Sequence, residues 1–316
     1  MLSIVVPAYN EAENIAPVAA RLREVLEKAD IPYEIVFVDD GSKDETFLNI
    51  QAAAKLDRRV SGVRFSRNFG KEAAIFAGLS QAKGDCCAVL DSDLQHPPEA
   101  LVEMYAFWRQ GYEIVEGVKA ERQDEPAANG LFARLFYLII SRLTGFDMGA
   151  SSDYKLLDRR VVDILLALPE RSTFFRGLTY WAGFRMAKVE YRVAPRLHGK
   201  SKWSFTGLVK YAIANITNFS SAPLSLITGT GIVMCIVGLV LSVQTLVRYI
   251  NGTAVEGFTT VILLQLITVG LVLMALGVIG HYIAKIYDEV KGRPRYIISG
   301  STNDPAEAPK GKNPAQ

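Results

Sequence analysis

Two long stretches without a charged residue constrain this 316-residue chain most. No Asp, Glu, Lys or Arg lies within residues 211–247 or within residues 257–284. A helix over residues 224–247 would be about 36 Å long at about 1.5 Å per residue, enough to cross a hydrocarbon core of about 30 Å. We therefore expect two transmembrane helices. The alternative is a pair of buried core helices, although soluble cores seldom contain uncharged runs above about 18 residues.

Basic residues flank the two uncharged runs on their outer sides. They cluster within residues 200–210 before the first run and within residues 285–295 after the second, whereas the short connection carries Arg248 against Glu256. Because basic flanks stay in the cytosol, we expect a multi-pass protein of the plasma (inner) membrane with both chain ends cytosolic. The first residues, MLSIVVPAYN, form a strand pattern without the features of a cleaved signal peptide.

The first 120 residues alternate short apolar runs with helical patterns. The runs predict strands, and they read SIVVPAY, EIVFVDD, GVRFSR, CCAVLDSD and YEIVEGVKA. Helices are expected between them over residues 13–28, 45–56, 72–82 and 98–110. This alternation is typical of a mostly parallel sheet covered by helices, so the expected fold class is α/β.

Polar side chains follow three of these strands, at the edge where open parallel sheets bind ligands. The clusters are Tyr9-Asn10-Glu11, Asp39-Asp40-Gly41-Ser42 and Asp91-Ser92-Asp93. Residues two apart in a strand share a face, and carboxylate oxygens suit Mg²⁺ or Mn²⁺ completed by substrate phosphates. The third cluster therefore predicts a metal site against a diphosphate, and its alternative is a pair of surface aspartates near a turn.

Phosphate-cradling glycine loops are missing from the sequence. Neither GxGxxG nor GxxxxGK[ST] follows any predicted strand. Their absence disfavours a dinucleotide dehydrogenase and a P-loop NTPase, and it favours a nucleotide bound through aspartates and a metal.

Four segments, in order, resemble the family-two glycosyltransferases with the GT-A fold. They are IVVPAYNEAENI, EIVFVDDGSKDET, SRNFGKEAAIFAGLSQAKGD and LDSDLQHPPE. The chain is most similar to polyprenyl-phosphate glycosyltransferases, which include GtrB-type undecaprenyl-phosphate glucosyltransferases and dolichyl-phosphate mannose synthases. The paired uncharged runs and the segment KGRPRYII add to this resemblance. It implies a Rossmann-like GT-A catalytic domain.

The expected domain organisation has four parts. These are a cytosolic catalytic domain over residues 1–202, a juxtamembrane interfacial helix over 203–222, two transmembrane helices over 223–287 and a cytosolic tail over 288–316. The end of the tail is rich in Pro, Asn, Lys and Ala, so we expect disorder from residue 299 onward.

The resemblance implies a nucleotide site at the first two strand ends. Pro7, Tyr9 and Glu11 would line the base and ribose. Asp39 would hydrogen-bond the base and Asp40 would support the turn. The alternatives are that Pro7 only ends a strand and that the aspartate pair only caps a turn, where Asp and Gly are favoured.

For the third cluster the resemblance implies metal and phosphate binding. Asp91 would contact the ribose or the metal, Asp93 the metal, and Gln95 the metal or a phosphate. The implied cofactor is Mg²⁺ or Mn²⁺. His96 is interpreted as structural.

Asp153, in GFDMGASSDYKLLDR, occupies the place of the family's proposed catalytic carboxylate. The acceptor would be a phosphate monoester, which is largely dianionic at neutral pH because its second pKa is near ~6. Such a nucleophile hardly needs a strong base, so Asp153 is expected to orient more than to deprotonate. The alternative is a helix N-cap for the apolar segment that follows.

Basic residues are expected to hold the phosphates. Arg122 and Arg134 resemble in position the arginines that grip the lipid phosphate, and Arg134 could instead reach lipid headgroups from an interfacial helix. Lys200, Ser201 and Lys202, in RLHGKSKWS, resemble a segment that closes over the donor diphosphate. A polybasic anchor to anionic lipid is the alternative for that segment.

Together these features predict a metal-dependent inverting transfer of a hexose, glucose by family likeness, from UDP-glucose to undecaprenyl phosphate at the cytosolic membrane face. Mannosyl or modified-arabinosyl transfer is the nearest alternative. A processive polysaccharide synthase is disfavoured because no QxxRW motif occurs, and a silent membrane scaffold is disfavoured by the three acidic clusters. No nucleic-acid partner is expected, and glycines in the uncharged runs would permit a homo-oligomer.

Overall fold

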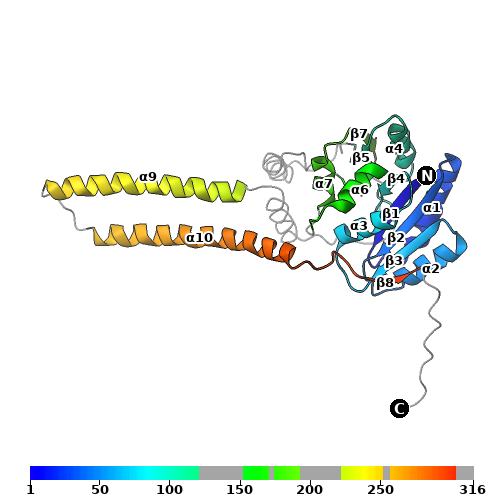
Figure 1. Ribbon diagram of the computed structural model, residues 1–316, viewed down its shortest axis with the longest axis horizontal. Coiled ribbons are helices and arrows are strands. Elements are labelled where there is room, and N and C mark those ends of the chain that lie inside the picture. The colour runs from blue at the N-terminus through cyan, green and yellow to red at the C-terminus, as the bar shows by residue number, and fades with distance from the viewer. Residues whose placement is uncertain (121–151, 171–173, 193–221, 252–256, 304–316) are drawn as a thin grey trace, which may run out of the picture. The chain divides into compact units, whose positions relative to one another are not determined.

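The computed structural model describes residues 1–120, 152–170, 174–192, 222–251 and 257–303 (Figure 1). The chain divides into two compact units. One unit comprises Met1–Ser204 together with Pro294–Gln316, and the other comprises Phe205–Arg293.

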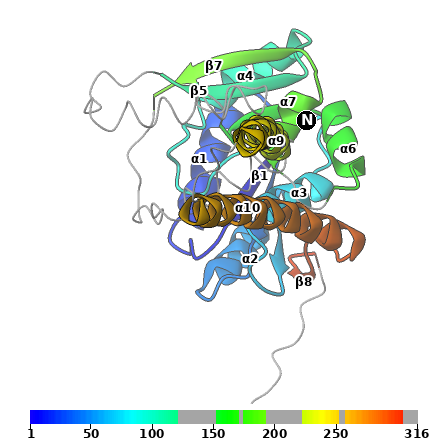
Figure 2. The same cartoon turned by 90° about the vertical axis from the view of Figure 1, so that its left-hand side faces the viewer.

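The first unit is built on a mixed eight-stranded sheet in the order β7-β5-β6-β4-β1-β2-β3-β8. Its strands are β1 (Leu2–Ala8), β2 (Tyr33–Asp39), β3 (Val60–Phe65), β4 (Cys86–Val89), β5 (Ile114–Lys119), β6 (Lys155–Asp158), β7 (Met186–Tyr191) and β8 (Ile298–Ser301). Strands β4, β1, β2 and β3 are parallel neighbours, and β5 is parallel to β7. Strand β6 is antiparallel to β4 and β5, and β8 is antiparallel to β3. Figure 2 shows β7 and β8 at opposite edges. The predicted α/β class with a mostly parallel sheet is confirmed.

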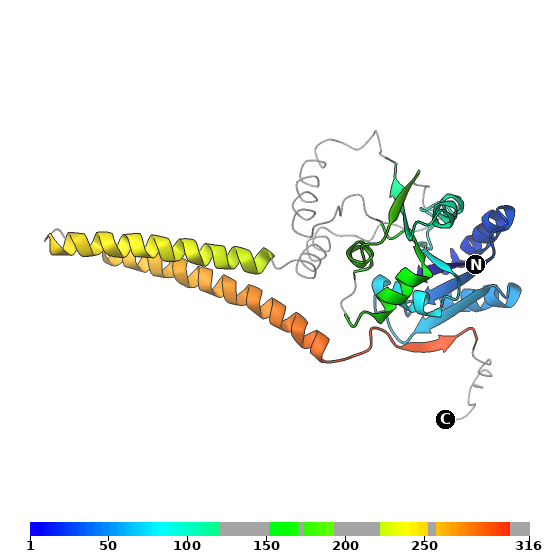
Figure 3. The ribbon, with the colours of Figure 1, turned by 45° about the horizontal axis from the view of Figure 1, so that its top comes forward.

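Helices cover both faces of this sheet (Figure 3). They are α1 (Ile15–Lys28), α2 (Thr46–Leu56), α3 (Lys71–Gln81), α4 (Ala100–Arg109), α6 (Arg159–Ala167) and α7 (Phe175–Trp181). Adjacent residues of β2 pack against helices on opposite faces of the sheet. Phe37 packs in the core under α1, α2 and α4, whereas Val38 packs with the alanines of α3. The four helices predicted before residue 120 are confirmed to within two residues at each end.

The end of the described chain returns to the sheet. Ile298–Ser301 forms β8 beside β3, and Gly62 N–H donates to Thr302 Oγ1 over 2.9 Å. The expectation of disorder from residue 299 is therefore wrong for the first residues of that segment. Its polar composition concealed a strand because the stabilising backbone pairs come from β3, far away in the sequence.

In the second unit, the described parts of the two uncharged runs lie in long helices, α9 (Ala222–Ile250) and α10 (Phe258–Val290). Leu224–Arg248 and Ile267–Val290 are long and apolar enough to cross a membrane, with mean hydropathies of 2.4 and 2.0. None of the residues in these windows is buried, which disagrees with the alternative of core helices. Of the interfacial helix expected over 203–222, residues 203–221 lie outside the described residues, and Ala222 is the first residue of α9.

Candidate active site

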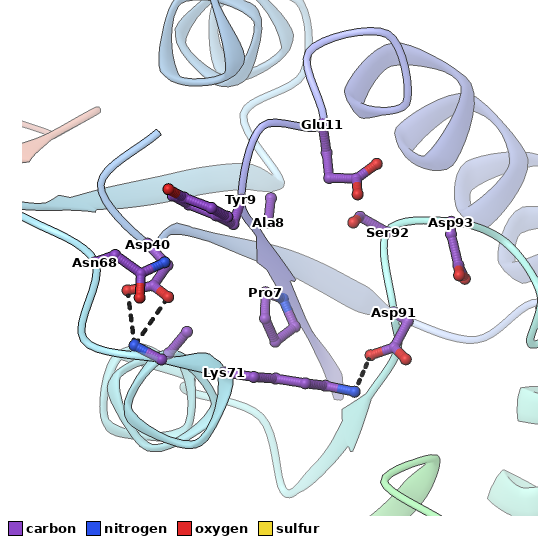
Figure 4. Close-up of a pocket in the computed structure, with 12 residues that line it drawn as sticks. Pro7, Ala8, Tyr9, Glu11, Asp40, Asn68, Lys71, Asp91, Ser92 and Asp93 are labelled. Atoms are coloured by element: carbon purple, nitrogen blue, oxygen red, sulfur yellow. Dashed lines mark hydrogen bonds and ion pairs between the residues drawn. The ribbon is translucent and has the colours of Figure 1, made fainter. Parts of the chain in front are cut away.

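A cavity of about 320 Å³ lies at the carboxyl ends of β1, β2 and β4 (Figure 4). It is lined by Pro7, Ala8, Tyr9, Glu11, Asp40, Asn68, Gly70, Lys71, Ala74, Asp91, Ser92 and Asp93. The structure thus brings together five residues of the predicted donor site, namely Pro7, Tyr9, Glu11, Asp91 and Asp93. Asp39 and Gln95 are not in the wall of this cavity.

Asp39 and Asp40 have different surroundings. Asp39 is fully buried, and its Oδ1 accepts a hydrogen bond from Ser42 N–H, so this side chain does close a turn. Its Oδ2 lies 3.3 Å from Arg64 Nε and is a buried acceptor without a hydrogen bond. Asp40 accepts from Phe69 N–H over 2.7 Å and Gly70 N–H over 2.9 Å, and burial raises its pKa. It therefore holds the loop that leads into α3.

Gly41 explains why this turn needs glycine. Its φ is +67°, and a Cβ there would lie 2.4 Å from the backbone carbon of Arg67. Any side chain would clash as well as strain the backbone. The close approach places the turn after β2 against the segment before α3, on one side of the cavity.

Lys71, to which no function was predicted, connects two predicted functional residues. Its Nζ lies 2.6 Å from Asp91 Oδ1 and 2.8 Å from Asp153 Oδ2. Burial lowers the pKa of Lys71, but the charges of Asp91 and Asp153 outweigh burial and raise it above its ordinary value. The sequence signal was available in part, since SRNFGKEAA follows a predicted strand at the same edge of the sheet.

Asp153 is held by a second cation, Arg176 of α7. The guanidinium donates from Nε to Oδ1 over 2.7 Å and from Nη2 to Oδ2 over 2.9 Å, a bidentate arrangement. Burial alone would raise the pKa of Asp153, but Lys71 and Arg176 hold it well below its usual range. A carboxylate paired in this way is a weak base, which agrees with orientation more than proton abstraction.

The N-cap alternative for Asp153 is wrong. The strand β6 follows it, and the next helix, α6, is capped by Asp158, whose Oδ1 accepts from Arg160 N–H over 2.9 Å. Both aspartates precede apolar segments, so local sequence could not distinguish them.

A fully buried ion pair joins the segment around Asp153 to β5. Lys155 Nζ contacts Glu116 Oε1 at 2.6 Å, and both side chains are 0% exposed. Ser152 N–H donates to Glu116 Oε1 over 3.0 Å, and Tyr180 O–H donates to Glu116 Oε2 over 3.0 Å. Residues on both sides of Asp153 are thereby tied to β5.

Glu72 connects α3 with α7. Its Oε2 accepts from Phe175 N–H over 2.8 Å, one residue before Arg176. Burial, with the nearby charge of Asp153 adding to it, raises the pKa of Glu72 to about 7. This carboxyl had no role in the sequence analysis.

The predicted metal ligands fit a divalent cation by donor chemistry. Asp91 and Asp93 present hard carboxylate oxygens to the cavity, and Mg²⁺ typically uses one or two carboxylates with substrate phosphates. Within the described ranges there is no group of three or more His, Cys, Asp or Glu residues that could hold a metal. Gln95 donates its N–H to Asp93 Oδ1 over 3.1 Å. A cation here would need ligands from the substrate.

His96 has the surroundings of a structural residue. It is buried, its ring stacks on Tyr154 with 5.0 Å between centroids, and it meets Tyr191 edge-on. Its Nδ1 lies 4.0 Å from Asp91 Oδ2, too far for a hydrogen bond. Burial lowers the pKa of His96, so the ring is neutral near pH 7.

The residues predicted to bind phosphate from outside the cavity are not placed by the structure. Arg122, Arg134, Lys200, Ser201 and Lys202 lie outside the described residues.

Comparison with known proteins identifies the family. Residues 3–164 match the family model described as glycosyl transferase family 2. This chain belongs to glycosyltransferase family 2. The resemblance carried by the four sequence segments is therefore confirmed.

Full-length relatives extend the similarity over both units. The chain is 40% identical over 301 residues to the uncharacterized glycosyltransferase YkcC of Bacillus subtilis (strain 168), covering 95% of this chain and 93% of the relative. It is 35% identical over 302 residues to the SfII prophage-derived bactoprenol glucosyl transferase of Shigella flexneri, covering 95% and 98%. The solved structure of a glucosyl-3-phosphoglycerate synthase from Mycobacterium tuberculosis is a distant relative. It is 20% identical, with a TM-score of 0.48, and the match covers 70% of this chain and 80% of that one.

Proposed function

We propose that this protein transfers glucose from UDP-glucose to a polyprenyl phosphate at the cytosolic face of the inner membrane, with inversion at the anomeric carbon. The observation that carries the proposal is a cavity lined by five of the residues predicted for the donor site, with Lys71 in its wall in contact with Asp153. Similarity to bactoprenol glucosyl transferases over about the whole chain supports the sugar and the acceptor.

The donor would bind along the strand ends. Pro7, Tyr9 and Glu11 would line the base and ribose. The proposed hydrogen bond from the base to Asp39 requires its buried Oδ2, which lies beside Arg64 and outside the cavity wall, to become accessible when the donor binds. The diphosphate would lie over Asp91 and Asp93. A divalent cation bound there supplies charge neutralisation for the departing nucleoside diphosphate.

The acceptor phosphate would attack from the opposite side of the sugar. One of its oxygens forms the new bond to the anomeric carbon as the bond from that carbon to the diphosphate oxygen breaks, so no covalent enzyme intermediate is needed. The monoester is already largely ionised near neutral pH. Asp153, held by Lys71 and Arg176, would orient the reacting groups instead of removing a proton.

The remaining parts of the proposal concern the membrane. The two apolar helices would span the bilayer as a multi-pass anchor and keep the polyprenol chain in the lipid. Arg122 and Arg134 are proposed to grip the acceptor phosphate. Lys200, Ser201 and Lys202 are proposed to close over the donor diphosphate.

The test is transfer of radiolabelled sugar to undecaprenyl phosphate by the purified full chain in detergent. Donors are UDP-glucose, UDP-galactose and GDP-mannose, each with Mg²⁺, with Mn²⁺ and with EDTA. We expect labelled lipid from UDP-glucose only, with label lost in EDTA. Asp93→Asn should lower transfer by about 100-fold or more, whereas Asp163→Asn, a matched change at an exposed site on α6, should not.

Other outcomes would replace the proposal. Lipid labelled from GDP-mannose would indicate a mannosyltransferase, and a growing polymer would indicate a polysaccharide synthase. Silence with every donor would favour a membrane scaffold.

A further inference from the structure

The side chain of Lys71 bridges two carboxylates at one end of the neighbouring strands β4 and β6. Asp91 follows β4, and Asp153 precedes β6. Figure 4 shows Lys71 extending from the start of α3 across the cavity to Asp91. Its Nζ is 2.6 Å from one carboxylate and 2.8 Å from the other, so a single ammonium neutralises part of each.

The two carboxylates depend on Lys71 to different degrees. Asp153 has a second cationic partner besides Lys71, because Arg176 contacts it in a bidentate arrangement. For Asp91, Lys71 is the one Lys or Arg within ion-pair distance among the described residues, and His96 Nδ1 is 4.0 Å away. Asp91 is therefore the carboxylate whose charge Lys71 chiefly compensates.

A divalent cation at Asp91 and Asp93 would compete with Lys71 for the same carboxylate oxygens. Two cations at one carboxylate repel each other, so the metal would displace the ammonium. The Lys71 side chain is 42% exposed, and its flexible stem leaves room to move while Asp153 still attracts it. The displaced ammonium would face the cavity in which phosphates are expected.

We propose that Lys71 is an exchangeable counter-ion: it occupies Asp91 when the site is empty and becomes a phosphate ligand when the metal and donor bind. This inference rests on the proposed function. It adds a residue with two successive partners, since a lysine ammonium binds carboxylate and phosphate alike as a point charge. The phosphate is that of the donor diphosphate or that of the lipid acceptor.

The exchange predicts opposite effects from one substitution. In Lys71→Met the competing charge at Asp91 is gone, so Mn²⁺ alone should bind about threefold more tightly or better, the factor expected from a partly exposed ion pair. Phosphate binding with saturating Mn²⁺ should instead weaken by about tenfold. A lysine with only a structural role would not produce opposite signs.

The experiment measures free Mn²⁺ by electron paramagnetic resonance during titration of the purified full chain without nucleotide. Lys71→Met and Lys71→Gln are compared with Lys71→Arg, which keeps the charge, and with Lys55→Met, an exposed lysine on α2. The first two should bind Mn²⁺ more tightly, and the last two should match the wild type. Circular dichroism checks that each variant is folded. Two neutral replacements of Lys71 are used so that the test still stands if one of them does not fold.

The source of the phosphate is assigned in a second step. Weaker UDP binding in Lys71→Met at saturating Mn²⁺ points to the donor diphosphate. Unchanged UDP binding with a raised KM for undecaprenyl phosphate points to the acceptor.

Unchanged or weaker Mn²⁺ binding in both neutral variants would overturn the exchange, and so would unchanged binding of both phosphates. Failure of the proposed function is separate, because it appears as absence of transfer by the wild type with every donor.

Discussion

Two lysine pairs in this protein have the same nitrogen to oxygen distance and opposite surroundings. Lys155 Nζ and Lys71 Nζ each lie 2.6 Å from a carboxylate oxygen, of Glu116 and Asp91 respectively. The first pair is 0% exposed on both sides, with Lys155 also 4.9 Å from the centre of the Tyr180 ring. The second pair is 42% and 29% exposed at the edge of the cavity.

The comparison shows that burial, more than distance, decides what an ion pair can do. Breaking a buried pair leaves a charge that water cannot reach, which costs about 3–5 kcal/mol, whereas exposed pairs contribute about 0–1 kcal/mol. The interior pair is suited to hold the framework around Asp153. The pair at the cavity is suited to exchange partners when a ligand arrives.

The largest expected effect comes from breaking the interior pair. Glu116→Ala leaves Lys155 buried without its counter-charge and removes the acceptor of Ser152 N–H, so we expect a loss of about 3–5 kcal/mol in unfolding free energy. Thermal or denaturant unfolding of the full chain in detergent measures it. Adding Lys155→Met should recover part of the loss, because the unpaired charge is then gone. If Glu116→Ala lost less than about 1 kcal/mol of unfolding free energy, the buried pair would be no stronger than the exposed pair of Lys71 and Asp91.

The next effect concerns the bidentate contact between Arg176 and Asp153. Arg176→Gln removes the charge and the bidentate geometry, so we expect transfer to fall by about 100-fold. Arg176→Lys keeps the charge but loses the bidentate contact, so we expect the transfer rate to fall roughly tenfold. Initial rates at saturating donor measure both. Equal activity of the lysine variant and the wild type would show that charge alone suffices at Asp153.

A smaller effect is a pH dependence of stability from Glu72, the residue that follows Lys71 on α3. Its pKa is raised to about 7 in the folded state by burial and the charge of Asp153, so the folded state binds this proton more tightly than the unfolded state. Stability should therefore fall as the pH rises from the unfolded value near ~4.5 through about 7. Glu72→Gln should unfold at a higher temperature than the wild type at about pH 8 and at a similar one at about pH 4, below the unfolded pKa. A variant that is less stable at both pH values would contradict this sign.

The smallest expected effect is on the stability of Lys71→Met. Because its pair with Asp91 is partly exposed and Asp153 retains Arg176, unfolding free energy should change by about 1 kcal/mol or less. The same unfolding measurement as for Glu116→Ala compares the two pairs directly. A loss as large as that of the interior variant would mean that Lys71 is structural.

Several features could be predicted because their signals are local. The helix over Ile15–Lys28 places Ile15, Val18, Leu22, Val25 and Leu26 on its buried side, the spacing that a helix requires. The polar clusters after β1 and β4 reach one cavity because parallel neighbouring strands end at the same edge.

Other predictions failed or were never made because the partners are far apart in the sequence. Lys71 and Asp153 are separated by 82 positions, and Gly62 and Thr302 by 240. Nothing near Asp153 distinguishes it from a helix cap, and the polar residues from 299 onward do not by themselves indicate a strand.

The sequence by itself determined the family, the helices and strands of the first 120 residues, and two apolar helices long enough to span a membrane. Hydrophobic periodicity, the length of uncharged runs and short motifs are properties of neighbouring residues, and they determine helices and strands without distant partners. Only the tertiary structure decided which charges meet. The sheet order places α3, β5, β6 and α7 around Asp153, and burial at that junction separates the fixed pair of Glu116 from the exchangeable pair of Asp91.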